Sequence, residues 1–322
     1  MELRPANLSR RRFCLCCLSA TTFAATGASL TPRQASAEAL GIVDSIKQAA
    51  AKDPIIAYPL RGNVTVLEGS GGNIAVLNGR DGKLMVDAGI GVSRPQIARA
   101  LADISPEPIT HLISTHWHFD HTDGNAWVQS TGASILAHEN TRTRLTAAQR
   151  VEDWSYTFPA PPPNALPTDV FSTERTMKIN GVTLGLKYYG PAHTDSDISV
   201  TFAEADILHA ADTFWNGVFP FIDYSTGGNI DGMIHATEAN LAATTNDTVI
   251  IAGHGRPVGN RSQLAQYRDM LVEIRETVAT LKRQGRPLDD ILAARPTAEY
   301  DSGWGHYAID GELFTRTIFE GV

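Results

Sequence analysis

Four side chains that can bind a metal ion lie within six consecutive residues of this sequence. His116, His118, Asp120 and His121 form the pattern His-x-His-x-Asp-His. Imidazole nitrogens and carboxylate oxygens are the ligands that zinc and neighbouring first-row metals take from proteins. A solvated polar loop is a poor alternative, because three of the ten histidines of the chain fall in these six positions. The pattern therefore predicts a metal site.

The residues before the motif predict how it is positioned. The apolar run Ile109–Ser114 predicts a buried strand that ends directly before it. Successive side chains of a strand point to opposite faces, so a strand could not aim all four ligands at one point. A loop just past the end of a strand can, and we expect the motif to form such a loop.

The rest of the chain predicts two mixed β sheets with helices outside them, in one domain. Alternating polarity predicts the strands, and a turn at residues 78–82 joins two of them. Residues 151–172 contain a proline cluster at 159–163 and are expected to form a long irregular loop. Helices are expected over residues 38–53, 94–104, 124–128, 139–150, 229–243 and 262–284, and strands over residues 63–67, 73–77, 83–86, 109–114, 134–137, 176–179, 183–189, 198–202, 207–210 and 249–252.

The motif and four further positions resemble the metallo-β-lactamase superfamily. The motif reads THWHFDHTDG over residues 115–124. Asp87 follows a predicted strand in the sequence VDAG, and His193, Asp212 and His254 stand in GPAHT, HAADT and AGHG. These features occur in order along most of the chain, which makes the resemblance specific for the superfamily but not for a substrate.

The resemblance implies a fold and a set of metal ligands. The fold is α/β, a four-layer αββα sandwich of two mixed β sheets flanked by helices. Asp212 would bridge two metal ions, and Asp87 would orient a ligand without binding metal itself. Asp120 would also act in catalysis, by orienting the bridging water or accepting its proton. The first ion would be held by His116, His118 and His193, and the second by Asp120, His121 and His254.

This ligand set implies a metal-dependent hydrolase with two Zn²⁺ per chain, with Fe or Mn as alternative metals. Two cations about 3.5–4 Å apart share one water and lower its pKa. A metal-bound hydroxide would then attack the carbonyl of an ester, lactone, thioester or amide in a small-molecule substrate.

Three other functions stay open. The first is hydrolysis of β-lactam antibiotics. Two features disfavour it. In β-lactamases of the superfamily the position of Asp212 is usually Cys or Ser, and the residues after Asp212 here are aromatic, with no lysine to bind a substrate carboxylate. A mononuclear iron oxygenase acting on sulfur substrates would use fewer of the second-ion ligands, all of which are present. A non-catalytic metal-binding protein is the remaining alternative.

The sequence predicts the roles of the remaining histidines and of one aromatic segment less specifically. His111, His138, His209 and His235 are expected to be structural, whereas His306 either packs or reaches a pocket mouth. The aromatic segment 213–224 either lines the substrate pocket or packs in the core.

The first residues predict an export signal. Residues 9–13 (SRRRF) form a twin-arginine pattern, residues 13–30 are apolar, and residues 35–37 (ASA) form a small-x-small cleavage site. The apolar stretch is short and rich in Ala, Ser and Thr for a bilayer span of about 20 residues. We therefore expect residues 1–37 to be a cleaved signal with no integral membrane segment after it. Residues 38–322 would form a periplasmic or secreted metallo-β-lactamase-like hydrolase domain.

Charge and cysteine content limit the partners and ligands. The formal net charge is −8, which disfavours nucleic acid as a partner. Loss of residues 1–37 removes five arginines and one glutamate, a charge of +4, so the mature chain would carry −12. All three cysteines, Cys14, Cys16 and Cys17, would leave with them. The mature chain would then have neither a disulfide nor a thiolate ligand.

Overall fold

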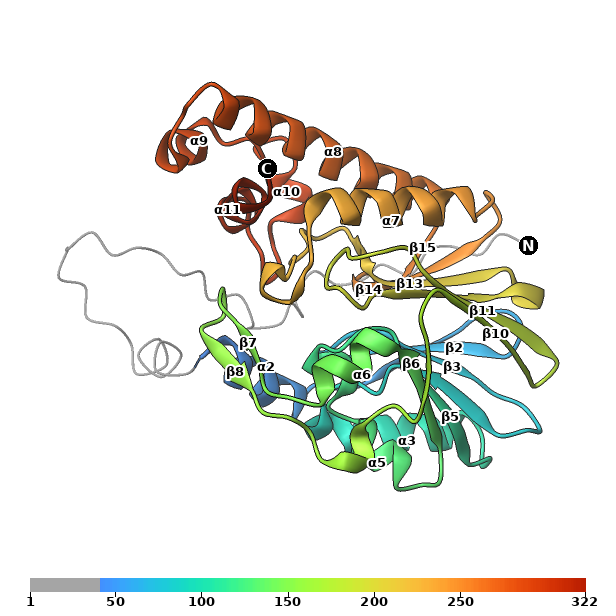
Figure 1. Cartoon of the computed structure of the whole chain (residues 1–322). Coiled ribbons are helices and arrows are strands. Elements are labelled where there is room, and N and C mark those ends of the chain that lie inside the picture. The colour runs from blue at the N-terminus through green and yellow to red at the C-terminus, as the bar shows by residue number, and fades with distance from the viewer. Residues whose placement is uncertain (1–40) are drawn as a thin grey trace.

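Two β sheets pack face to face in the computed structural model, which describes residues 41–322 (Figure 1). Helices cover the outer face of each sheet, so the order of layers is helix, sheet, sheet, helix. The predicted fold class is confirmed. The signal predicted for residues 1–37 lies outside the described residues. Among residues 41–322, no helix combines the length and the apolar character needed to cross a membrane.

The first sheet has seven strands in the order β1-β2-β3-β4-β5-β6-β9. The first four strands are antiparallel, and β4, β5, β6 and β9 are parallel to one another. The polar motif therefore begins at the carboxyl end of a central parallel strand. The strands are β1 Ile56–Pro59, β2 Val64–Glu68, β3 Ile74–Leu77, β4 Lys83–Val86, β5 Ile109–Ser114, β6 Ser134–His138 and β9 Asp169–Phe171.

The second sheet has six strands in the order β10-β11-β12-β13-β14-β15. Its pairs are antiparallel except for β13 and β14, which are parallel. The strands are β10 Glu174–Ile179, β11 Val182–Tyr188, β12 Ile198–Phe202, β13 Ile207–Asn216, β14 Val249–Gly255 and β15 Val258–Gly259.

Alternation along the strands assigns apolar side chains to the two faces of each sheet. In β3, Ala75 and Leu77 belong to the core between the sheets, whereas Ile74 and Val76 pack toward α3 (Arg94–Ile104). The helices α7 (Ile230–Ala242) and α8 (Arg261–Arg283) contact β13 from the outer side of the second sheet. The remaining helices are α2 Ile42–Ala50, α4 Phe119–Thr122, α5 Asn125–Gln129, α6 Glu139–Leu145, α9 Leu288–Ala294, α10 Asp301–Trp304 and α11 Gly311–Gly321.

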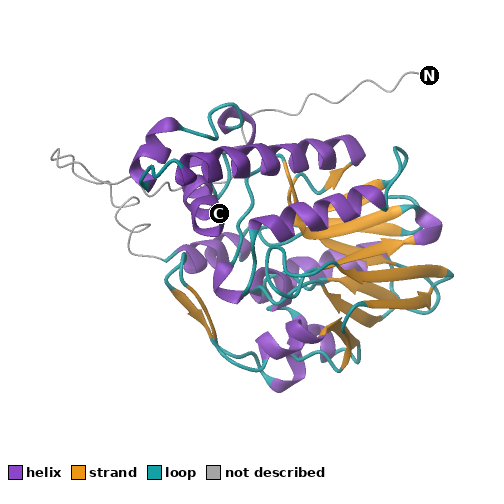
Figure 2. Ribbon diagram, turned by 45° about the horizontal axis from the view of Figure 1, so that its top comes forward, coloured by secondary structure: helices purple, strands orange, loops and turns teal. Residues whose placement is uncertain are grey.

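The main departures from the predicted elements lie near the site. A two-stranded hairpin of β7 (Gln149–Val151) and β8 (Tyr156–Phe158) begins within the last two residues of the helix predicted for 139–150 and extends into the loop predicted for 151–172. This loop also contains β9 of the first sheet. Figure 2 shows this hairpin apart from both sheets. The strand predicted for residues 207–210 continues to Asn216, although its pairing with β14 is interrupted on both sides of Ala211. Local polarity did not reveal either feature, because both depend on pairing with distant segments.

Candidate metal centre

The predicted ligands come from the ends of strands in both sheets. The motif follows β5, and α4 begins inside it, so Asp120 and His121 lie on a short helical turn after His118. His193 lies in the connection between β11 and β12, and His254 lies near the end of β14.

Asp212 lies in the irregular part of β13. Ala211 before it has a φ of 47°, and its amide donates to Nδ1 of the buried His209 at 3.1 Å. This bulge interrupts the alternation of the strand beside the end of β14. The predicted structural role of His209 agrees with this hydrogen bond.

The structure brings all seven predicted ligands together. Three groups have donor atoms that all lie within 4.8 Å of one another. Two groups are the trios predicted for the first and second ions. The third joins the trios. These groups are His116, His118 and His193, then Asp120, His121 and His254, and finally His116, His121 and Asp212.

Asp212 lies between the two trios. Its Oδ2 is 3.3 Å from Nε2 of His193 and 3.3 Å from Nε2 of His254. Its Oδ1 is 3.2 Å from Nε2 of His121. One carboxylate thus contacts donors of both trios, as a bridging ligand must.

The donor set fits divalent metal ions. Tetrahedral zinc with bonds of about 2.0–2.1 Å separates neighbouring donors by roughly 3.3 Å. The separations around Asp212 are close to this value, as is the 3.2 Å between Asp120 Oδ2 and His254 Nε2. Nε2 of His116 is fully buried and has no hydrogen-bond partner, which is costly for an imidazole nitrogen unless a ligand binds it.

Two glycines leave room for this cluster. A Cβ on Gly253 would lie 2.1 Å from Oδ1 of Asp212, and a Cβ on Gly72 would lie 2.1 Å from Cε1 of His121. Both backbones therefore approach the ligands more closely than any side chain would permit.

Burial and charge set the protonation of the ligands. Burial lowers the pKa of His193 to about 4 and that of His116 well below its usual value. Burial raises the pKa of Asp120, but His121 and His254 outweigh this and lower it to about 2. Burial lowers the pKa of His254, yet Asp212 and Asp120 raise it to about 9. A metal ion that binds His254 takes the place of its proton, so binding releases protons.

Two buried carboxylates, neither of them a predicted ligand, contact ring nitrogens of the predicted histidine ligands. Oδ2 of Asp87 accepts hydrogen bonds from Nδ1 of His121 and from Oγ1 of Thr115, each at 2.8 Å. This geometry agrees with the orienting role implied for Asp87. Oδ2 of Asp223 lies 3.0 Å from Nε2 of His118. Sequence reasoning missed Asp223, because it stands 105 residues from His118 in an apolar segment with no metal-binding pattern.

The aromatic segment after Asp212 packs partly in the core and partly against the donor cluster. Phe214 and Phe219 are buried against Tyr267 and Phe314. The ring of Trp215, in contrast, lies 4.2 Å from that of His254.

Aromatic residues from two other segments flank the cluster. Trp154 of the β7–β8 hairpin stacks on Phe221 and lies 6.0 Å from the ring of His118. Tyr307, between α10 and α11, lies 6.4 Å from the ring of His254. His306 is exposed and belongs to none of the three donor groups. The sequence alone could not place these side chains, because only the tertiary fold brings their segments to the ligands.

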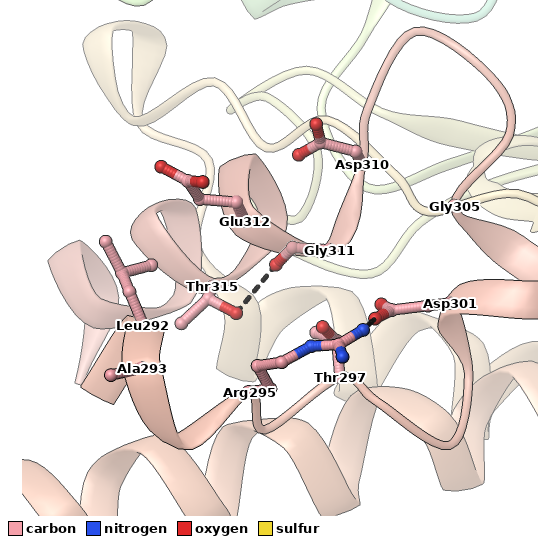
Figure 3. Close-up of a pocket in the computed structure, with 10 residues that line it drawn as sticks. All are labelled: Leu292, Ala293, Arg295, Thr297, Asp301, Gly305, Asp310, Gly311, Glu312 and Thr315. Atoms are coloured by element: carbon pink, nitrogen blue, oxygen red, sulfur yellow. Dashed lines mark hydrogen bonds and ion pairs between the residues drawn. The ribbon is translucent and has the colours of Figure 1, made fainter. Parts of the chain in front are cut away.

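A separate cavity of about 510 Å³ lies among the C-terminal helices (Figure 3). Arg295 lines this cavity, and its guanidinium forms an ion pair with Asp301 at 2.8 Å. None of the seven clustered ligands lines this cavity. The donor cluster, not this cavity, is therefore the candidate functional site.

Comparison with known proteins identifies the family. Residues 67–277, about two thirds of the chain, match the family described as "Metallo-beta-lactamase superfamily". The chain belongs to this superfamily. All seven clustered ligands lie within the matched residues, whereas Tyr307 lies outside them. The clustered histidines and aspartates of this superfamily member favour divalent metal binding.

Curated relatives match parts of the chain. A hydroxyacylglutathione hydrolase from Polaromonas sp. is 26% identical over 48% of this chain and 52% of its own length. A hydroxyacylglutathione hydrolase from Rhodospirillum rubrum is 25% identical over 65% of this chain and 78% of its own length. The alpha subunit of a 2,4-dinitroanisole O-demethylase from Nocardioides sp. is 34% identical over 39% of this chain and 35% of its own length. The chain thus spans about half the length of the Polaromonas relative and about a third of the length of the Nocardioides relative.

A solved structure supports the superfamily fold. The metallo-beta-lactamase from Pontibacter korlensis superposes with a TM-score of 0.55 at 17% identity, over 67% of this chain and 98% of its own. At this identity the likeness concerns the fold alone.

Proposed function

We propose that the protein is an exported hydrolase that holds two Zn²⁺ ions and cleaves an ester, lactone, thioester or amide. In this proposal His116, His118 and His193 hold one ion, and Asp120, His121 and His254 hold the other. Asp212 would help to hold both ions. Residues 1–37 would direct export and then be cleaved, which would leave residues 38–322 as the mature domain.

The position of Asp212 carries the proposal. Its two oxygens lie 3.2–3.3 Å from imidazole nitrogens of both trios. A mononuclear site needs one trio only, and a structural buried carboxylate needs a single cation or hydrogen-bond partner. Contacts to both trios support two ions that share one ligand.

The residues of the site supply positioning and proton handling. Two divalent cations at such a site lower the pKa of a shared water and polarise a carbonyl under attack. Asp120 is the more exposed of the two acidic ligands, with a side chain 13% exposed against 2% for Asp212. Its low pKa keeps it ionised, so its carboxylate would accept a hydrogen bond from the attacking water and orient it. Because so weak a base takes a proton only from an acidic donor, it would receive the proton of the water only after bound cations had lowered the pKa of that water.

The substrate class rests on the surroundings of the site and on the curated relatives. Trp154, Trp215 and Tyr307 flank the donor cluster with apolar rings, which favours a substrate with an apolar group beside the scissile carbonyl. Two of the curated relatives are hydroxyacylglutathione hydrolases by name. Thioesters are therefore the first substrates to assay, followed by lactones and other esters.

Metal content is the decisive first measurement. Elemental mass spectrometry on residues 38–322, purified without added metal, is expected to find about two zinc ions per chain. About one iron per chain would contradict the proposal and would favour an oxygenase of sulfur substrates. Rapid hydrolysis of β-lactams with no turnover of thioesters or lactones would favour the β-lactamase alternative. Two zinc ions with no turnover on any of these substrates would favour a metal-binding protein.

Substitutions test the assignment of the ligands. His116→Ala and Asp120→Ala are each expected to lower metal content and to abolish turnover. Asp212→Cys is expected to disturb the binding of both ions while leaving the circular dichroism spectrum unchanged. Full activity with both ions in Asp212→Cys would exclude a bridging role for this residue.

A further inference from the structure

His118 presents its two ring nitrogens to two different partners. Nδ1 lies 2.8 Å from Nε2 of His193, inside the first trio. Nε2 lies 3.0 Å from Oδ2 of Asp223 on the opposite edge of the ring. All three side chains are buried, with Asp223 0% exposed. The ring is thus held between the donor cluster and a carboxylate.

The carboxylate selects one tautomer of His118. An ionised carboxylate only accepts hydrogen bonds, so Nε2 of His118 must carry the proton and donate it. Nδ1 is then left with its lone pair directed at the cluster, which is the form that binds a metal ion.

A second hydrogen-bond chain fixes the carboxylate itself. Oγ1 of Thr226 donates to Oδ2 of Asp223 at 2.6 Å, and Nε1 of Trp117 donates to Oγ1 of Thr226 at 3.1 Å. Trp117 is the residue directly before His118. These hydrogen bonds therefore lead from Asp223 back to the metal motif, and together with the contact between Asp223 and His118 they form a closed, buried network.

The segment of residues 221–226, which contains Asp223 and Thr226, also orients His193. Nδ1 of His193 donates to the carbonyl oxygen of Phe221 at 2.7 Å, and the amide of Asp223 donates to the carbonyl of His193 at 2.8 Å. Two of the three donors of the first trio are thus held by residues 221–226. The second trio has a different support, since Asp87 binds His121.

We propose that Asp223 is a positioning residue that fixes the tautomer and orientation of His118 and so sets the affinity of the first metal ion independently of the second. The inference rests on the proposed pair of metal ions. It assigns each ion its own buried carboxylate, Asp223 for the first and Asp87 for the second.

Asp223→Asn is the main test, because asparagine keeps the shape but not the charge. Asp231→Asn is a matched control, since this carboxylate is exposed and paired with Arg275 on α7 and α8. Loaded protein would be titrated against a chromophoric chelator to obtain the two successive Zn²⁺ affinities. In Asp223→Asn one affinity is expected to fall about 10–100-fold, with the other changed less than about 3-fold. The control is expected to keep both.

The identity of the affected ion is read from the Co²⁺-substituted protein. The Nε2 proton of His118 is expected to give a hyperfine-shifted exchangeable NMR signal that Asp223→Asn loses and Asp87→Asn retains. If Asp223→Asn does not fold, Thr226→Val provides the test, because it removes one hydrogen bond to Asp223 and leaves the carboxylate. It is expected to weaken the same ion by a smaller factor.

The outcomes separate this inference from the proposed function. Folded Asp223→Asn with both affinities and the exchangeable signal of the wild type would overturn the positioning role. Equal weakening of both ions would also overturn it. Wild-type protein with a single ion that Asp223→Asn weakens would refute the dinuclear centre but uphold the role of Asp223.

Discussion

Gly72→Ala is expected to displace the predicted metal ligand His121 without replacing any ionisable residue. Gly72 lies in the loop between β2 and β3, and its amide donates to the carbonyl of Asp120 at 3.2 Å. A Cβ there would lie 2.4 Å from Nε2 of His121. Ordinary carbon contacts begin near 3.5 Å, so the loop or the ring must move by about 1 Å. The ring is held by Asp87 at 2.8 Å and is fully buried.

A displacement of this size exceeds what a metal centre tolerates. Ligand distances at a metal site vary by about 0.2 Å, and a misplacement of about 1 Å costs roughly 100-fold in rate. Gly72→Ala is therefore expected to lose one metal ion per chain and at least about 100-fold in kcat/KM. Gly303→Ala is the matched control, since a Cβ on Gly303 meets no atom within 4 Å. Two bound ions and full turnover in Gly72→Ala would show that the loop moves instead, and would refute the reasoning.

Three further predictions follow from the same geometry. Burial raises the pKa of the Asp197 carboxyl well above its usual value, and the nearby Asp212 adds to the shift. The folded protein therefore favours the neutral carboxyl, and the stability that this preference gives is lost as the pH rises above about 4, where the unfolded chain ionises. Urea unfolding of Asp197→Asn at pH 5 and pH 8 should therefore show a smaller loss of stability with rising pH than the wild type shows. Trp154→Ala is expected to raise KM about 10-fold while kcat and metal content stay unchanged, because one apolar contact is worth about 1–3 kcal/mol; a change in kcat alone would contradict this. Removal of metal by a chelator is expected to lower Tm by roughly 10 °C, because an ion at about 1,000 times its Kd stabilises the protein by about 4 kcal/mol; an unchanged Tm would indicate that the ions do not hold the fold.

The clustering of the predicted ligands could be anticipated from the sequence because most of them lie close to a strand signal. The apolar runs of β4, β5 and β14 ended at or near Asp87, the motif and His254, and the structure places these ends near one another. A loop after a strand needs only local polarity to be recognised. The parallel pairing of β4 with β5 and of β13 with β14 then gathers the ends at one edge of each sheet.

The residues that surround the ligands could not be predicted in this way. Asp223, Trp154 and Tyr307 reach the cluster from segments without periodic patterning, and their partners lie far away in the chain. The bulge at Ala211 was also missed, because its cause is a hydrogen bond to His209 and not a turn residue. Local propensity records none of these long-range contacts.

The two trios draw their donors from both sheets. His118 and His193 are 75 residues apart in the chain, and His121 and His254 are 133 residues apart. An ion bound by either pair would close a long loop of chain, as a reversible cross-link does. Force applied to pull the first sheet from the second would then have to break coordination bonds as well as the apolar core. The mechanical strength of the molecule would depend on the supply of metal in its surroundings.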